Sequence, residues 1–119
     1  QKTAYEIKEC DWSSDVCSSD LIVKDDETYV LRDNKFLKNL VVSSTELKAG
    51  KSTRGHAHAG QEEVYYFISG SGRMELDNQL LDIKENDVVL IPDGAFHRVH
   101  NLTDKPLYFV CVFDGQRNH

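Results

Sequence analysis

Two histidines separated by one residue, His56 and His58, are the first feature of this sequence that could do chemistry. On a β-strand this spacing puts both imidazoles on one face, because side chains alternate between the two faces. A turn at residues 59–62 then brings the chain back, so that a carboxylate of the next strand lies beside the histidines. Imidazole and carboxylate are common transition-metal ligands, but paired histidines also occur on solvated strands that bind nothing.

Two adjacent residues, Glu62 and Glu63, compete for the role of that carboxylate. Alternation along the strand does not decide between them, because aromatic or aliphatic side chains follow on both faces. One face would carry Tyr65 and Phe67, and the other Val64, Tyr66 and Ile68. If His56 and His58 point inward, the same alternation also points Arg54 inward, near the mouth of any cavity.

The elements that would position these residues are β-strands, because apolar residues from Ile22 onward recur with a period of two rather than 3.6. Turn residues interrupt the runs every 8 to 12 or so positions, which is typical of a sandwich or barrel. Asp77-Asn78 suits a two-residue hairpin turn. The expected strands are 28–32, 36–47, 54–59, 63–69, 73–76, 79–84, 88–91, 96–101 and 107–113.

Two longer patterns surround the candidate ligands. They read Gly50-x5-His56-x-His58-x4-Glu63-x6-Gly70 and Asn86-x5-Pro92-x-Gly94-x2-His97-x3-Asn101. Together they resemble the two signature motifs of the cupin superfamily, and the resemblance covers essentially residues 22–119. The chain departs at Asn86, where the family has glycine; asparagine tolerates a left-handed backbone better than other residues, so we expect the turn to survive.

The resemblance implies an all-β fold, the cupin double-stranded β-helix, which is a jelly-roll-like antiparallel barrel. It also implies one divalent transition-metal ion held by His56, His58, Glu63 and His97, with motif spacing favouring Glu63 over Glu62. Three imidazoles and a carboxylate suit Fe, Mn, Ni, Co, Cu or Zn, whereas Mg or Ca would want more oxygen ligands. Four ligands on an ion that prefers six would leave about two positions for water or substrate.

Other side chains are candidates for the chemistry around such an ion. Tyr65 and Glu62 are the catalytic candidates, because either could move a proton or orient a substrate. Arg54 could receive a carboxylate or phosphate, and Phe67 points into the cavity by alternation and could contact substrate. Tyr65 and Arg54 also have purely structural interpretations, as a packed aromatic and as a charge at a strand end.

Composition limits the remaining possibilities. The chain has 119 residues and a net charge of −6, without a basic cluster, which argues against a nucleic-acid partner. No apolar run approaches the roughly 20 residues of a membrane span. Residues 1–21 resemble a translated sequencing adapter, so we expect a non-native, disordered segment before a domain at 22–119. Cys111 is then a lone, buried thiol, which suits the cytoplasm.

The superfamily is functionally broad, so function does not follow from the fold. The stretches around both motifs are similar to small cupins described as sugar-phosphate isomerases. We therefore expect a metal-dependent enzyme that acts on a small polar metabolite such as a sugar or sugar phosphate. A dioxygenase and a non-catalytic small-molecule-binding or sensory module are the alternatives. Cupins usually dimerise through outer strands, and outward Val64, Tyr66 and Ile68 suggest a homodimer.

Overall fold

The computed structural model describes residues 21–57 and 59–115, and within these ranges every regular element is a β-strand. The described residues include no helix with the length and apolar character needed to cross a membrane. The strands are β1 (Leu21–Asp25), β2 (Tyr29–Asn34), β3 (Leu40–Leu47), β4 (Glu63–Ser69), β5 (Ser71–Leu76), β6 (Gln79–Lys84), β7 (Val88–Ile91), β8 (His97–His100) and β9 (Leu107–Asp114).

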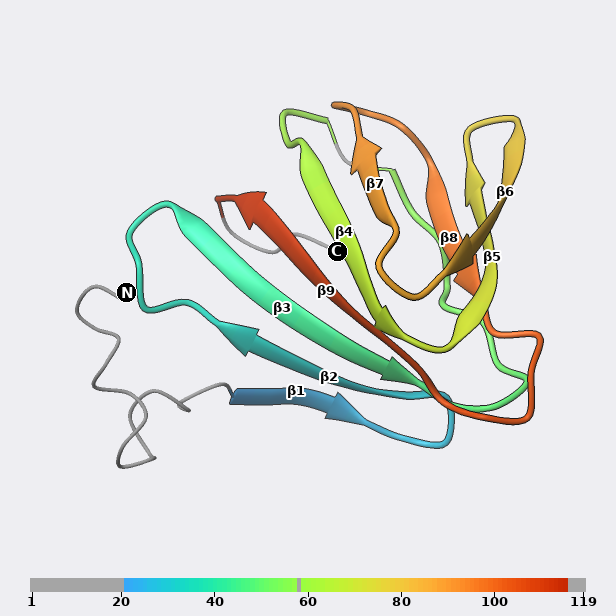
Figure 1. Cartoon of the computed structure of the whole chain (residues 1–119). Coiled ribbons are helices and arrows are strands. Elements are labelled where there is room, and N and C mark those ends of the chain that lie inside the picture. Colours follow the sequence, from blue (N-terminus) through green and yellow to red (C-terminus); the bar gives the residue numbers. More distant parts are fainter. Residues whose placement is uncertain (1–20, 58, 116–119) are drawn as a thin grey trace.

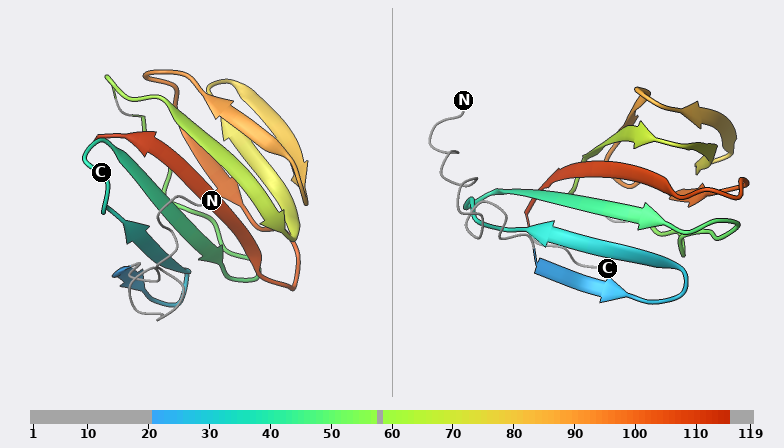
Figure 2. Two further views of the ribbon diagram at one scale, coloured as in Figure 1. Left: turned by 60° about the vertical axis from the view of Figure 1, so that its left-hand side comes forward. Right: turned by 60° about the horizontal axis from the view of Figure 1, so that its bottom comes forward.

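These strands form two antiparallel sheets (Figures 1 and 2). The larger sheet has the order β1-β2-β3-β9-β4-β7 and the smaller one β6-β5-β8. Strands distant in sequence are neighbours, since β9 lies between β3 and β4, and β8 lies beside β5. The predicted all-β jelly-roll architecture is confirmed.

Alternation of side chains places the core between the two sheets. On β4, Glu63, Tyr65 and Phe67 are buried while Val64 and Tyr66 are exposed, so the parity that the sequence left open is resolved. The core takes side chains from both sheets, such as Phe109 of β9 and Met74 of β5. Burial of this apolar surface is the main stabilising contribution to such a fold.

The expected turns form where the residues allow a positive φ. Asn86 adopts φ +76° in place of the glycine of the motif, so the turn before β7 survives the substitution. Asp77 and Asn78 join β5 to β6 as a two-residue hairpin turn, with Asp77 at φ +52°. Asp77 also accepts a hydrogen bond from the Phe96 amide at 3.0 Å, which ties this hairpin to the chain just before β8.

Asn101 organises the loops at the end of β8. Its side chain is 1% exposed, and its amide nitrogen donates to the carbonyl oxygens of Leu47, Lys48 and Lys105 at 3.1, 3.2 and 2.7 Å. Its Oδ1 accepts from the Thr103 amide and hydroxyl. The side chain of the last residue of the second motif therefore joins three chain segments through hydrogen bonds.

The structure corrects two of the expected strands. The one at 36–47 begins only at Leu40. The predicted strand at 54–59 is not regular: only isolated bridges pair Ser52 with His100 and His56 with His97. Gly55 between them has φ +80°, which a continuous strand does not permit. β1, an edge strand that begins at Leu21, was not among the expected strands. Residues 1–20 lie outside the described residues, so the adapter-derived segment stays a prediction there, whereas Leu21, its expected last residue, lies in β1.

Candidate metal centre

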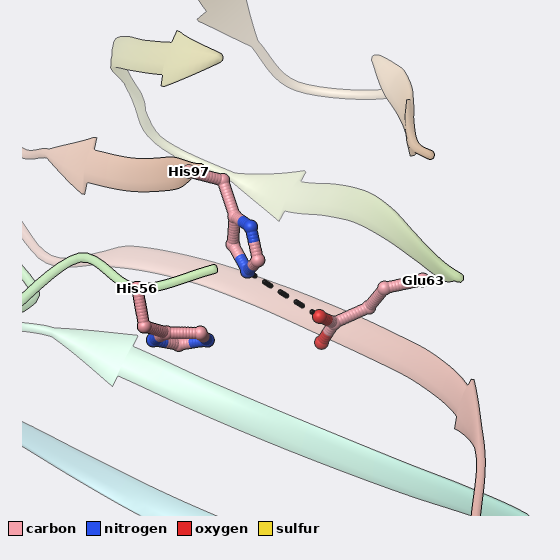
Figure 3. A group of neighbouring side chains, drawn as sticks. All are labelled: His56, Glu63 and His97. Carbon is pink, nitrogen blue, oxygen red and sulfur yellow. Dashed lines mark ion pairs between the residues drawn. The ribbon is translucent and has the colours of Figure 1, made fainter. Parts of the chain in front are cut away.

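Three of the four predicted metal ligands converge between the two sheets. One ligand atom from each of His56, Glu63 and His97 lies within 4.8 Å of the others (Figure 3). Donors on an ion with bonds of about 2.1 Å are about 3–4 Å apart, so small side-chain rotations would bring these atoms into coordination. His58 lies outside the described residues, and its role as a ligand stays a prediction.

His56 and His97 are placed by direct pairing of their backbones. The amide of each donates to the carbonyl of the other, at 3.1 Å from His56 and 3.0 Å from His97. Residues that exchange both hydrogen bonds lie opposite each other with their side chains on one face. The two imidazoles consequently lie edge to face, with ring centroids 4.5 Å apart.

Glu63 reaches the same point from the other sheet. It is the first residue of β4 and pairs with Ile91 of β7 on one side and Phe113 of β9 on the other. Its Oε1 lies 3.4 Å from Nε2 of His97, and the two side chains are only 3% and 1% exposed. Burying a carboxylate so deeply is costly without a compensating positive charge, so this environment suits a cation.

The hydrogen bonding of His97 prepares its ring for a cation. Its Nδ1 lies 3.0 Å from the carbonyl oxygen of Ala95. A carbonyl only accepts, so Nδ1 must carry the proton, and in the neutral ring Nε2 then presents its lone pair toward Glu63. A backbone bond of this kind commonly orients metal-binding histidines. The donor set of two imidazoles and one carboxylate therefore fits a transition-metal ion.

The segment that carries His56 is held by isolated backbone bridges and by side chains rather than by a continuous ladder. Ser52 Oγ lies 2.7 Å from Nδ1 of His100, and Thr53 Oγ1 accepts from the Val99 amide at 3.0 Å. Arg98 Nε donates to the Thr53 carbonyl at 2.8 Å. These contacts fix residues 52–56 against β8 although the strand is irregular.

His100 lies on the other face of β8 from His97, as its position in the strand predicts. Its Nε2 is 2.8 Å from Oε1 of Glu75, and its Nδ1 faces Ser52. It is also absent from the group of converging donors. His100 therefore belongs to the anchoring contacts of the smaller sheet.

The converging donors open into a cavity of about 420 Å³. Arg54 and Tyr65, which the sequence analysis selected, line this cavity. Phe67 is fully buried in the core and is not among the lining residues, so its position does not favour contact with substrate. Glu62 is exposed and also outside the lining, in contrast to buried Glu63.

Several lining residues were missed by the sequence analysis. Ser43 and Thr45 of β3 face the cavity, and Cys111, expected as a buried core thiol, is buried and also lines it. Polar residues at alternate positions of β3 were an available signal. Lys24 and Tyr29, from β1 and β2, gave no signal of their own, because their position depends on strand pairing.

Comparison with known proteins agrees with the fold. A family model described as Cupin domain (Cupin_2) matches residues 43–113. Among solved structures, Bacillus subtilis oxalate decarboxylase, in a study of its Mn(II) centers, superposes with a TM-score of 0.76 at 21% identity. That superposition covers 87% of this chain and 30% of the other, so it supports the fold alone.

Sequence relatives carry more than one name. Glucose-6-phosphate isomerase of Thermococcus litoralis is 27% identical over 97% of this chain, which spans 66% of that protein. An oxalate-binding protein of Thermotoga maritima is 31% identical over 67 residues, covering 56% of this chain and 55% of the relative. The chain is therefore similar both to isomerases and to a protein named for binding alone.

Proposed function

The chain belongs to the Cupin_2 family of cupin domains, and on that premise we propose that it is a metal-dependent enzyme that acts on a small polar metabolite. The metal would be one divalent transition-metal ion, held by His56, His58, Glu63 and His97. The observation that carries this proposal is the convergence of three of these side chains within 4.8 Å at a cavity of about 420 Å³.

A bound ion of this class supplies a Lewis acid that polarises substrate oxygens. The protein orients the donor atoms and excludes water from part of the centre. His97 is fixed by the Ala95 carbonyl, and Glu63 is held in the β4 ladder, so the donors need little rearrangement. Burial of both groups excludes water from one side of the centre, while the cavity leaves the other side open.

Tyr65 is the side chain best placed to assist a substrate in this cavity. Its ring stacks on Phe109 at 5.4 Å, and it meets the edge of His97 at a centroid distance of 5.7 Å. These contacts fix the direction of the phenol, which can donate or accept a proton. We propose that Tyr65 orients substrate or moves a proton, and that Arg54 contacts substrate from the mouth.

The substrate we propose first is a sugar phosphate, with isomerisation as the reaction, because relatives named glucose-6-phosphate isomerase match most of this chain. A binding module without turnover is the second candidate, supported by the relative named oxalate-binding protein. Incubation with glucose 6-phosphate, followed by NMR for fructose 6-phosphate, separates the two. Turnover supports the isomerase, whereas saturable oxalate binding without turnover supports the binding module.

The metal centre itself is tested by elemental analysis of protein purified without added metal. We expect about one transition-metal ion per chain, and His97→Ala should weaken metal binding by at least about 100-fold, since even indirect contacts to a ligand contribute 10–100-fold. His100→Gln is the comparison variant, because it removes an imidazole from the other face of β8. It also removes the contact with Ser52, so we expect a loss of no more than a few-fold in metal binding. Unchanged metal content in His97→Ala would overturn the assignment.

We also propose that the chain forms a homodimer through the outer face of the larger sheet. Strand pairing aligns four aliphatic side chains there, Val42, Val112, Val64 and Leu90, in one continuous row. Val64 and Leu90 are 39% and 67% exposed, and burying such a row in an interface would be favourable. Light scattering tests this proposal, and a monomer at all concentrations would contradict it.

A further inference from the structure

We propose that the mouth of the cavity binds the anionic end of the substrate, a carboxylate or a phosphate, through Lys24 on β1 together with Arg54. The proposal rests on the function proposed above, because it concerns the same cavity. It adds a residue, Lys24, that no motif indicates, and assigns the anionic end of the substrate to the mouth of the cavity.

The pairing of β1 with β2 points Lys24 toward the cavity. Lys24 lies directly opposite Leu31, and residues opposite each other in an antiparallel pair point to the same face. Leu31 and Tyr29 of β2 both line the cavity, and so does Lys24. The pairing is irregular between Ile22 and Lys24, so adjacent residues Val23 and Lys24 both reach the lining, which regular alternation would not allow.

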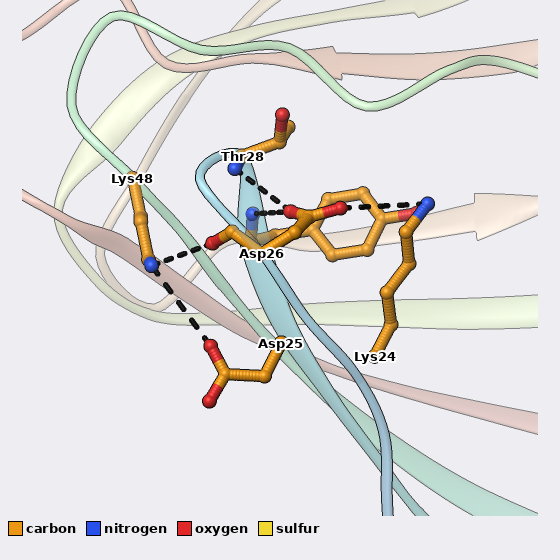
Figure 4. A network of polar contacts seen from close by, with 6 residues as sticks. Lys24, Asp25, Asp26, Thr28 and Lys48 are labelled. Carbon is orange, nitrogen blue, oxygen red and sulfur yellow. Dashed lines mark hydrogen bonds and ion pairs between the residues drawn. The ribbon is translucent and has the colours of Figure 1, made fainter.

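Contacts with neighbouring residues hold the Lys24 ammonium in place, and Figure 4 shows it beside the Asp26 carboxylate. Its Nζ donates to the Tyr29 hydroxyl at 3.4 Å and lies 5.0 Å from the centroid of the same ring. It also lies 3.6 Å from Oδ2 of Asp26. The Lys24 side chain is 45% exposed, and a solvated ion pair of this kind is weak, so an incoming anion can replace Asp26 as its partner.

Asp26 is itself occupied by other bonds. Its Oδ1 accepts from the amides of Tyr29 and Thr28 at 3.0 and 2.8 Å, and these two bonds hold its pKa below the ordinary value of 3.8. Lys48 donates to the Asp26 carbonyl at 2.6 Å from the other side of the turn (Figure 4). The turn therefore keeps its shape without the ammonium of Lys24, which leaves Lys24 available to a ligand.

The balance of charge in the cavity also favours an anion. Lys24 and Arg54 are positive, and Glu63 is the one carboxylate among the described lining residues. Asp26 pairs with Lys24 from outside the lining, so these four charges sum to zero, and a divalent ion at the centre would raise the sum to +2, although the whole chain carries −6. A positive cavity in an acidic protein concentrates anions at this point and repels them from the rest of the surface.

An inward or exposed lysine on an edge strand has another known use, which is to prevent strands of different molecules from pairing. That use requires a charge on β1 but no ligand. A measurement of anion binding therefore distinguishes the two roles, whereas a measurement of solubility alone does not.

The test is calorimetric titration of the full chain, in its metal-bound form, with inorganic phosphate and separately with acetate at constant ionic strength. We expect at least one of these anions to bind, and Lys24→Met to weaken that binding about tenfold, which is 1.4 kcal/mol. Lys24→Arg should retain most of it, since the charge remains. Lys38→Met, at an exposed position outside the cavity, is the matched control and should bind as the parent chain does.

The two anions distinguish a phosphate from a carboxylate as the group of the substrate that the site binds. Dependence on Lys24 for phosphate alone identifies a phosphate end, and dependence for acetate alone identifies a carboxylate end. Equal binding by Lys24→Met and the parent chain for both anions would overturn the proposal. Metal content, measured on each preparation, reports separately on the metal centre, so an intact centre with no effect at Lys24 defeats only the anion site.

Discussion

The two sides of the candidate centre are built in different ways. Glu63 stands in β4, between β7 and β9, where regular pairing fixes it on both sides. His56 stands in an irregular segment that touches β8 through only two isolated bridges and a set of side-chain hydrogen bonds. The contrast indicates that the larger sheet determines the stability of the domain, whereas the irregular segment determines the fit of the ligands.

The largest expected effect is in the regular region. Phe67 of β4 is fully buried, so Phe67→Ala should lower the free energy of unfolding by about 3–5 kcal/mol through lost burial and the cavity left behind. Leu80→Ala, at an exposed position of β6 outside the proposed dimer interface, is the control and should cost much less. Thermal or denaturant unfolding measures both. A mild effect at Phe67 would show that stability does not reside in this sheet.

A smaller effect on stability, with a larger one on the metal, is expected at Gly55. An added Cβ would lie 2.8 Å from Cζ of Phe96 and 3.1 Å from Cβ of Arg98, at φ +80°. Gly55→Ala should therefore cost about 1–2 kcal/mol from the backbone and displace His56, which weakens metal binding about tenfold or more.

Gly50 supplies the control for this experiment. It has a similar φ of +72°, but a Cβ there would meet nothing within 4 Å. Gly50→Ala should lose comparable stability and keep its metal affinity, measured by competition with a chelator. If both variants bind metal equally well, the position of residues 52–56 does not control the centre.

The smallest expected effect follows from Ser52. Ser52→Ala removes the 2.7 Å contact with His100, so we expect a loss of about 1 kcal/mol in stability and a few-fold weaker metal binding. Ser71→Ala, at an exposed position of β5, should change neither. Chelator competition and thermal unfolding report both quantities. A metal affinity identical to that of the parent chain would show that the backbone bridge between His56 and His97 is sufficient to position His56.

The same contrast explains which parts of the fold could be predicted. Strands β4, β6 and β7 have the predicted bounds, because alternation and flanking turn residues mark both ends of each. The segment at 54–59 failed as a strand because Gly55 interrupts it, and motif spacing carries no information about backbone regularity. β1 was missed because it is a short edge strand, with Ile22 and Val23 still about half exposed.

Three of the candidate ligands that the structure brings together could be selected from the sequence, but the cavity around them could not. Motif spacing selects Glu63 over Glu62, and the structure places Glu63 among the converging donors and Glu62 outside the lining. Lys24 could not be found in this way, because its direction depends on the pairing of β1 with β2 and on a local irregularity. Such features depend on tertiary pairing, which one sequence does not specify.

The hydrogen bonds of Asn101 also make the stability of the domain sensitive to deamidation at this position. Deamidation would convert the side chain to aspartate with almost no change in shape, but it would replace the donating nitrogen by an oxygen that faces three carbonyl groups. Oxygen would then oppose oxygen at each of these contacts inside a buried corner, at a cost of several hydrogen bonds. A domain that carries aspartate at this position would therefore be less stable than the parent domain.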